Sequence, residues 1–315
     1  MKRLLLALAI LGLGTLALSQ STTLTAVRAS DLSLDAGAAY WTDAPTLEVQ
    51  MVAAQEGDAD GPVVMLQAVY DNDSIAIRAE WADATESVMK NAWTWDGTAF
   101  TKSGDEDRIM FAWPIGNNPD FASKGCTAAC HNEGDDTSTW WMGSDSDDVR
   151  FDAWQWKAAR TNPVGYIDDK WWGTLTDPED VESSRHGDSR EGGSYANNRN
   201  EEQTGPTFMS SEGTAARFIV DGQQIELDTS TLAVGDVIPG YILAAAVGSR
   251  GDIATRGVWT DGKWVVVLMR PLDTGHDDDT VFRVRRRTPF GLSVVDDGGG
   301  LSHTVGEEVL VLDWK

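Results

Sequence analysis

Basic residues and cysteines are scarce in this chain, and each shortage argues against a class of protein. The 315 residues include 25 lysines and arginines against 50 aspartates and glutamates, which gives a formal net charge of −25. A surface of that sign repels phosphate backbones, so nucleic acid is not an expected partner. The chain has two cysteines and four histidines, and it therefore lacks the second cysteine pair that a four-cysteine zinc site requires.

Long apolar runs are also absent after the N-terminus. Lys2 and Arg3 precede an apolar stretch at residues 4–18, and Ala17-Leu18-Ser19 fits a small-residue cleavage site. The stretch is shorter than the roughly 20 residues that span a membrane. We therefore predict a signal peptide over residues 1–19 and an exported, periplasmic mature chain with no membrane span. An uncleaved N-terminal anchor is the alternative.

Short strands separated by Asp, Gly and Asn turns account for most of the remaining sequence. Expected strands occupy residues 63–70, 74–81, 108–114, 217–220, 257–260, 264–269, 290–295 and 308–312. The dipeptide Asp261-Gly262 predicts a tight hairpin between two of them. Helical periodicity is weak, and short helices are expected only at residues 88–93 and 152–160.

This pattern predicts an all-β fold, an antiparallel β-sandwich with short helices and long loops. No internal repeat and no linker divides the chain, so we expect one domain over residues 20–315. Residues 173–213 are rich in Asp, Glu, Ser, Asn and Gly, and they predict a long acidic loop, of the kind that is functional or mobile.

The two cysteines stand close together in Gly125-Cys126-Thr127-Ala128-Ala129-Cys130-His131. Covalent haem attachment uses two thiols for thioethers and a following imidazole for the iron, in the pattern C-x-x-C-H, whereas this chain has C-x-x-x-C-H. A local disulfide between Cys126 and Cys130 and a metal site are the other interpretations. The cysteine–histidine dipeptide has no purpose in a disulfide, which favours haem.

A haem iron takes a second axial ligand, and two residues are candidates. His303 follows a glycine run in a loop between the last two expected strands, and Met142 follows Trp140-Trp141, close in sequence to the cysteines. The structural alternatives are an exposed loop histidine and a methionine that fills a gap in the core. Tryptophan pairs also gather after the cysteines, and they suit either core packing or a pocket for a large flat ring.

The block from Met142 to Asp169 resembles a known family. Its specific words are Trp154-Gln155-Trp156-Lys157-Ala158-Ala159-Arg160, Pro163-Val164-Gly165-Tyr166 and Asp168-Asp169. The block is similar to the haem-binding domain of two groups of proteins. One comprises the γ subunits of ethylbenzene dehydrogenase and related molybdenum enzymes of the dimethyl-sulfoxide-reductase superfamily; the other comprises periplasmic c-552-like cytochromes. Weaker similarity spans most of the mature chain.

The resemblance implies an antiparallel β-sandwich that holds one haem at its edge. In the γ subunits the haem is of the non-covalent b type, with methionine and lysine as axial ligands. Met142 matches that methionine, and His303 falls where the lysine would be. This chain adds Cys126, Cys130 and His131, as c-type members do. We therefore expect haem c, with haem b as the alternative, and iron ligated by His131 and His303, with Met142 as the alternative ligand.

The resemblance further implies an electron-transfer protein or subunit that is not itself an enzyme. The expected partner is a redox protein, such as the iron–sulfur subunit of a molybdenum enzyme or another cytochrome. The acidic surface either steers a basic partner or serves solubility. We expect Trp141 to line the haem pocket, and Lys157 to form an ion pair or contact a haem propionate without ligating iron.

A second class of function, a binding module, remains open. A β-sandwich with surface tryptophans can bind carbohydrate, with Cys126 and Cys130 in a structural disulfide and no haem. A hydrolase is disfavoured because no catalytic constellation stands out. The acidic runs at residues 145–148 and 277–279 are expected to be solvated loops rather than calcium sites, with His186 and His276 facing solvent or, less favoured, an ion.

Overall fold

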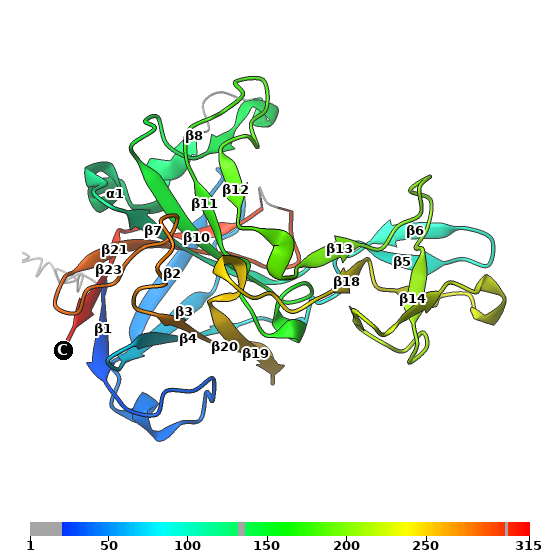
Figure 1. Ribbon diagram of the computed structural model, residues 1–315, viewed down its shortest axis with the longest axis horizontal. Coiled ribbons are helices and arrows are strands. Elements are labelled where there is room, and N and C mark those ends of the chain that lie inside the picture. The colour runs from blue at the N-terminus through cyan, green and yellow to red at the C-terminus, as the bar shows by residue number, and fades with distance from the viewer. Residues whose placement is uncertain (1–20, 132–135, 300–301) are drawn as a thin grey trace, which may run out of the picture.

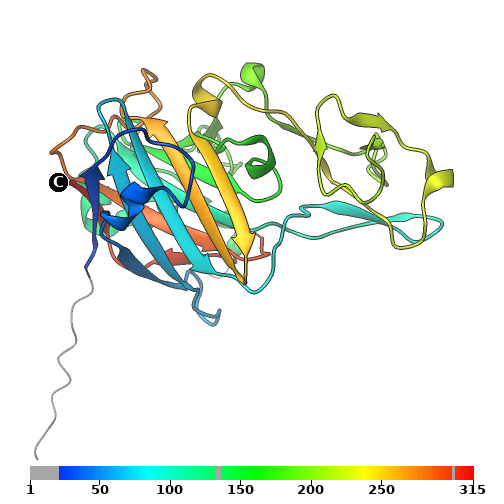
Figure 2. The same cartoon turned by 90° about the horizontal axis from the view of Figure 1, so that it is seen from below.

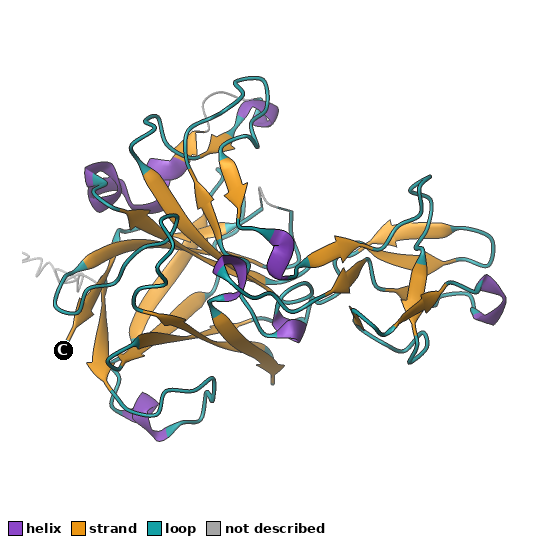
Figure 3. Cartoon of the chain, viewed as in Figure 1, coloured by secondary structure: helices purple, strands orange, loops and turns teal. Residues whose placement is uncertain are grey.

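The computed structural model describes residues 21–131, 136–299 and 302–315 (Figure 1). The predicted signal peptide lies outside the described residues. Strands dominate the chain, with short helices between them (Figure 3). None of the described helices has the length and apolar character needed to cross a membrane.

Thirteen of the described strands form one continuous sheet, which folds over to make two layers. Strands β2 and β21 join the layers because each changes partner midway. Residues 47–50 of β2 pair with β3 and residues 51–53 with β22, while residues 288–290 of β21 pair with β23 and residues 291–295 with β7. The thirteen strands are β1 (Thr23–Arg28), β2 (Leu47–Ala53), β3 (Val63–Tyr70), β4 (Ser74–Ala82), β7 (Arg108–Ile115), β10 (Arg150–Lys157), β11 (Lys170–Trp172), β12 (Arg185–Gly187), β19 (Ala254–Thr260), β20 (Lys263–Pro271), β21 (Thr288–Val295), β22 (Thr304–Gly306) and β23 (Leu310–Trp314).

The space between the two layers is filled by the main hydrophobic core. Tryptophans dominate it: the ring centroids of Trp156 and Trp264 lie 4.9 Å apart, and those of Trp113 and Phe290 lie 4.8 Å apart. Successive side chains of a strand point to opposite faces, so every second side chain points into this core. The predicted antiparallel β-sandwich is confirmed, and Figure 2 looks onto the layer in which the cyan β4 lies beside the gold β20 and β19.

Most expected strands are found at or near their predicted positions, and so is the hairpin. Asp261 and Gly262 have φ angles of 51° and 76° and connect β19 to β20, as a tight hairpin turn requires. The two expected helices were wrong. Residues 150–157 form β10, and residues 92–95 form β5. Side chains of β10 are buried on both faces, and its alternation of polar and apolar residues is interrupted at Ala153-Trp154, so the period of a half-buried strand is not visible.

A group of small sheets projects from one end of the sandwich, at the right of Figure 1, and is called the outer lobe (residues 92–103 and 195–243). The expected long loop at residues 173–213 contributes β13 and β14 to this lobe, and it also contains β12 of the main sheet. The lobe has its own hydrophobic core around Trp93, Met209, Ile219 and Ile238. Its strands are β5 (Ala92–Trp95), β6 (Phe100–Ser103), β13 (Tyr195–Asn197), β14 (Phe208–Ser210), β15 (Ile219–Val220), β16 (Gln224–Glu226), β17 (Val237–Ile238) and β18 (Tyr241–Leu243).

The remaining elements are short. The described chain has one α-helix, α1 (Pro119–Lys124), and one further strand pair, β8 (Cys130–His131) with β9 (Trp141–Met142). The single turns of 3-10 helix are η1 (Ala39–Thr42), η2 (Gly125–Ala129), η3 (Thr137–Thr139), η4 (Asn162–Val164), η5 (Arg190–Gly192), η6 (Thr229–Thr231) and η7 (Ser249–Gly251).

A buried charge network joins the sandwich to the outer lobe. The carboxylate of Asp168, which is fully buried, forms ion pairs with Lys157 at the end of β10 and with Arg250 in η7, and it accepts a hydrogen bond of 3.1 Å from the Tyr195 hydroxyl of β13. Burial by itself would raise the pKa of Asp168. The ammonium of Lys157, with Lys170 and Arg250, outweighs burial and holds the pKa of the carboxyl well below its usual range.

Replacing Asp168 should therefore destabilise the protein strongly. Asp168→Asn leaves Lys157 and Arg250 buried without their anion, and we expect a loss of about 3–5 kcal/mol of unfolding free energy at pH 7. Because the folded pKa lies below the unfolded value of 3.8, this contribution is present above pH 3.8 and is lost as the pH falls toward the folded pKa. Urea unfolding at pH 7 and pH 3 measures both effects. The exposed Glu201→Gln is the control, and equal losses at the two pH values would contradict the argument.

Candidate functional site

A cavity of about 680 Å³ opens at the edge of the sandwich, beside the cysteine motif. Its volume falls within the range of about 300–1,000 Å³ that is typical of small-molecule and cofactor sites. Five of the residues predicted to bind haem line it: Cys126, Cys130, Trp141, Met142 and His303. The other lining residues are Ala54, Gln55, Thr127, Thr137, Ser138, Trp140, Val181, Glu182, Arg185 and Val305.

The cysteines are held by a compact turn that follows helix α1. Asn118 caps the helix, its side-chain oxygen accepting a hydrogen bond of 3.0 Å from the Phe121 backbone N–H, and the chain then continues directly into η2. Cys126 lies in η2 and Cys130 begins β8, so both thiols reach the same cavity. The two cysteines are free and not joined in a disulfide.

The turn rests on a row of small residues that crosses three strands. Gly291 of β21, Ala112 of β7 and Ala153 of β10 are in register with one another. Ala112, Ala153 and Cys126 belong to one hydrophobic cluster on this outer face of the sheet. A Cβ atom on Gly291 would lie 2.4 Å from the Cβ of Cys126, so only glycine allows the approach. The row therefore sets the position of Cys126.

Strand pairing brings the methionine beside the second cysteine. In the β8–β9 pair, Cys130 is opposite Met142 and His131 is opposite Trp141. Successive residues of a strand point to opposite faces, and Cys130 accordingly lines the cavity while His131 is not among the lining residues.

The ring of His131 stacks on Trp141, with centroids 3.9 Å apart and planes 7° apart. Its Nδ1 lies 3.6 Å from Oδ1 of Asp145, and its Nε2 is buried without a hydrogen-bond partner. The predicted ligand His131 thus sits behind the tryptophan that lines the cavity.

His303 lines the cavity from a segment that is distant in sequence from the cysteine motif. It directly precedes β22, and its carbonyl oxygen accepts a hydrogen bond of 3.1 Å from the backbone N–H of Ala54, just after β2. His303 also lines a second cavity of about 720 Å³, whose wall includes the carboxylates of Asp58, Asp60 and Asp83. It therefore stands between the cysteine cavity and an acidic one.

Burial controls the state of both thiols. Removal from water raises the pKa of Cys126 to about 12, with a further increase from the neighbouring Cys130, and burial also raises the pKa of Cys130. A thiol is reactive as a nucleophile and binds metals mainly as the thiolate. Both groups are therefore neutral at physiological pH, and they present an apolar, soft-sulfur wall to the cavity.

Lys157 is not at this cavity. Its side chain is 3% exposed and forms the ion pair with Asp168 described above. Of the two roles expected for Lys157, an ion pair or a contact with a haem propionate, the structure shows the ion pair. The cation that does line the cavity is Arg185 of β12, whose Nη1 lies 2.6 Å from the Oε2 of Glu182, a lining residue on the same edge. No sequence signal distinguished Arg185 from the other polar residues of 173–213, because strand β12 was not expected there.

The donor set suits a haem. Two thiols for attachment, a methionine sulfur and an imidazole nitrogen line one cavity, and methionine and histidine are common axial ligands of haem iron. An arginine at the rim matches a carboxylate such as a propionate. The residues present therefore fit the group that the sequence motif implies.

Comparison with known families agrees with the resemblance of residues 142–169. A family model described as ethylbenzene dehydrogenase matches residues 38–305, most of the chain. The chain belongs to the ethylbenzene dehydrogenase family. The comparison with curated proteins finds no match.

Three solved structures are similar to this member of the ethylbenzene dehydrogenase family at low identity. A protein from Bacteroides uniformis ATCC 8492, solved as a candidate carbohydrate-binding protein, is 10% identical, with 93% of this chain and 99% of that chain covered and a TM-score of 0.40. A family 9 carbohydrate-binding module from Caldicellulosiruptor kristjanssonii is 7% identical in complex with glucose (93% and 95% covered, TM-score 0.37) and with cellotriose (93% and 93%, TM-score 0.33). Likeness at this level does not indicate what the present chain binds.

The close approach at Gly291 predicts a clear effect of one methyl group. In Gly291→Ala the new Cβ would overlap Cys126, forcing the turn outward, and we expect a loss of about 1–3 kcal/mol of unfolding free energy. Urea unfolding measures the loss. We also expect faster alkylation of Cys126, because a displaced turn exposes its thiol. Gly37→Ala, where the added Cβ meets the nearest atom at 3.4 Å, is the control. Wild-type stability in Gly291→Ala would contradict the packing argument.

Proposed function

We propose that this member of the ethylbenzene dehydrogenase family is an exported electron-transfer protein or subunit that carries one haem c on Cys126 and Cys130. The observation that supports the proposal is the single cavity lined by both thiols, a methionine and a histidine. When bound, haem iron accepts and releases one electron at a time. The role of the chain is to hold it and to set its potential through ligands, burial and nearby charge.

Covalent attachment fits the neutral state of the two thiols. Each thiol would add across a vinyl group of the porphyrin: a sulfur–carbon bond forms, the S–H proton passes to the adjacent carbon, and no electron is lost. Such addition needs both cysteines reduced and facing one ligand, which is how Cys126 and Cys130 lie. Arg185 at the cavity rim would then pair with a propionate.

The lining of the cavity favours Met142 and His303 as the residues that would ligate the iron. Both line the cavity, and they come from separate elements, β9 and the start of β22. Ligation by His131, the ligand favoured by the sequence motif, would require its ring to leave the stack on Trp141. His303 is common to both arrangements, so the choice lies between Met142 and His131.

The partner that we propose is a basic redox protein, such as an iron–sulfur subunit of a molybdenum enzyme or another cytochrome. The net charge of −25 would accelerate encounter with a positively charged partner and make the rate depend on salt. The acidic cavity beside His303 provides one such surface next to the proposed ligand. The family name supports a role within an oxidoreductase system, and the catalytic chemistry would belong to the partner.

Intact-protein mass spectrometry under denaturing conditions tests the attachment. We expect the mature chain from a host competent in cytochrome maturation to carry the added mass of one haem. Cys126→Ser and Cys130→Ser should each reduce the covalent haem, and the double variant should abolish it. Ser123→Ala in the neighbouring helix is the control and should retain haem fully.

Two outcomes would contradict the proposal. A chain lighter by two hydrogens and free of haem would indicate a Cys126–Cys130 disulfide, as in a binding module. Haem that is released on denaturation would indicate a b-type site and disprove covalent attachment.

Absorption spectroscopy and redox titration identify the ligands. We expect Met142→Leu, which conserves volume, to remove the charge-transfer absorption of methionine-ligated ferric haem, and Met142→His to lower the reduction potential, because methionine ligation raises it. His303→Gln should alter both spectrum and potential, while His131→Gln should leave the spectrum unchanged. Met209→Leu, in the core of the outer lobe, is the control for a methionine replacement. A spectrum changed by His131→Gln and not by Met142→Leu would reverse the assignment.

A further inference from the structure

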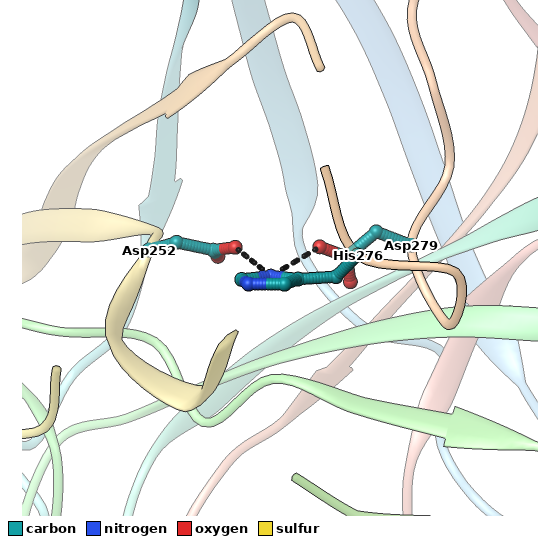
Figure 4. A group of neighbouring side chains, drawn as sticks. All are labelled: Asp252, His276 and Asp279. Carbon is teal, nitrogen blue, oxygen red and sulfur yellow. Dashed lines mark ion pairs between the residues drawn. The ribbon is translucent and has the colours of Figure 1, made fainter. Parts of the chain in front are cut away.

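Acidic side chains from four separate segments of the chain come together at a site that does not include the cysteines. Asp152 is on β10, Asp169 directly precedes β11, Asp252 follows η7, and Asp279 lies in the connection between β20 and β21. Together these four residues are called the aspartate cluster. His276 joins it from the same connection as Asp279, and Figure 4 shows the imidazole lying between Asp252 and Asp279.

The cluster consists of two compact groups of ligand atoms that share Asp279. Nδ1 of His276 lies 3.3 Å from Oδ2 of Asp252 and 3.6 Å from Oδ2 of Asp279. Ligand atoms of Asp252, His276 and Asp279 lie within 4.8 Å of one another, and so do those of Asp152, Asp169 and Asp279. Asp279 belongs to both groups, which makes them one continuous set. Its 4% exposure also corrects the expectation that residues 277–279 form a fully solvated loop.

Positive charge within the cluster is insufficient. Arg270, fully buried, places Nη1 3.1 Å from Oδ2 of Asp152 and Nη2 3.7 Å from Oδ2 of Asp279, and it also donates to the Thr280 carbonyl at 2.7 Å. This guanidinium therefore pairs with two of the four carboxylates, and the imidazole of His276, 37% exposed, lies beside Asp252 and Asp279. Buried carboxylates without compensating charge are costly, which is why such groups are normally paired or coordinate a metal.

Two of the buried carboxylates have an oxygen without a hydrogen-bond donor. Asp169 is 1% exposed, and its Oδ2 has no partner although its Oδ1 accepts from the Lys170 backbone N–H at 2.9 Å. Asp152 is fully buried, and its Oδ1 has no partner although Oδ2 accepts from Arg270 and, at 2.8 Å, from the Thr280 backbone N–H. Native proteins rarely leave buried polar atoms unsatisfied, and an ion at the site is one explanation.

We propose that the aspartate cluster binds a divalent cation, Ca²⁺, through the carboxylate oxygens of Asp152, Asp169, Asp252 and Asp279. Calcium takes oxygen ligands at about 2.3–2.6 Å, so ligands on opposite sides of the ion lie about 5 Å apart, whereas the shorter bonds to Mg²⁺ require about 4 Å. Ligand atoms within each of the two groups lie within 4.8 Å of one another, which leaves room for an ion at calcium distances, and calcium tolerates the irregular geometry of such a set better than Mg²⁺ does. Waters would complete the coordination at the side of His276, where the cluster reaches solvent.

The ion would connect the strand beneath the cofactor cavity to two loops. Asp152 lies between Phe151 and Ala153, both of which belong to the cluster that supports the cysteine turn. Asp252 and Asp279 come from the segments that flank β19 and β20. Binding should therefore stabilise the folded chain by mass action, independently of whether haem is attached.

Calorimetric titration of the full mature protein, dialysed against a chelator and retaining whatever cofactor it carries, tests the site. We expect CaCl₂ to bind with one strong site per chain and to raise the melting temperature. Asp169→Asn and Asp252→Asn should each weaken binding by more than about tenfold, because Ca²⁺ affinity follows the number of charged ligands. Asp277→Asn, an exposed aspartate of the same connection, is the matched control and should bind as the wild type does.

Three results would overturn the proposal. The first is the absence of both calcium heat and a melting shift in the wild type. The second is calcium binding that Asp169→Asn and Asp252→Asn leave unchanged, which would locate the ion elsewhere on the acidic surface. The third is preference for Zn²⁺ or Mn²⁺ that His276→Gln abolishes, since this would make the imidazole a ligand of a different metal. Asp252 is partly exposed, so Asp252→Asn tests the site even where Asp169→Asn fails to fold.

Discussion

The candidate site depends on one packing constraint, the flat outer face that three neighbouring strands present to the cysteine turn. Gly291, Ala112 and Ala153 form a row across β21, β7 and β10. The adjacent row, Leu292, Phe111 and Trp154, points the other way and fills the main core. Strand alternation thus gives the same three strands a bulky inner face and a flat outer one. The cysteine turn can lie close to the sheet only on this flat outer face. The cavity forms where the turn packs against it.

Buried charge is distributed unequally on the two sides of this arrangement. Asp168 is one carboxylate facing three cations, Lys157, Lys170 and Arg250, so its negative charge is compensated without any ligand. The aspartate cluster around Asp279 is the reverse, with several carboxylates and one guanidinium. A chain of net charge −25 has few cations to bury. Three of them lie in the network that joins the outer lobe to the sandwich. An external cation would therefore stabilise the aspartate cluster more than it would stabilise the network around Asp168.

The sequence indicated the fold class and five of the fifteen residues that line the cavity, but not the features that depend on pairing between distant strands. Strands such as β3 and β7, and the Asp261-Gly262 hairpin, carry local signals of alternation and turn chemistry. Strand β10 resembled a helix because both of its faces are buried, and the two-residue or three-residue strands of the outer lobe are too short to show any period. Gly291 looked ordinary in sequence, since the contact that requires it is with Cys126.

The same reasoning explains why His131 is a natural prediction from sequence and a poor fit to the cavity. A cysteine–histidine dipeptide suggests that both side chains serve one ligand. Cys130, however, has φ −101° and ψ 119°, an extended conformation, and its pairing with Met142 fixes the alternation of β8. In an extended pair, neighbouring side chains point to opposite faces, and Cys130 lines the cavity whereas the ring of His131 stacks on Trp141 and is not among the lining residues. The residue that shares the face of Cys130 is its cross-strand partner Met142. The conformation of Cys130 and its pairing with Met142 therefore explain why the methionine, and not His131, lines the cavity together with His303.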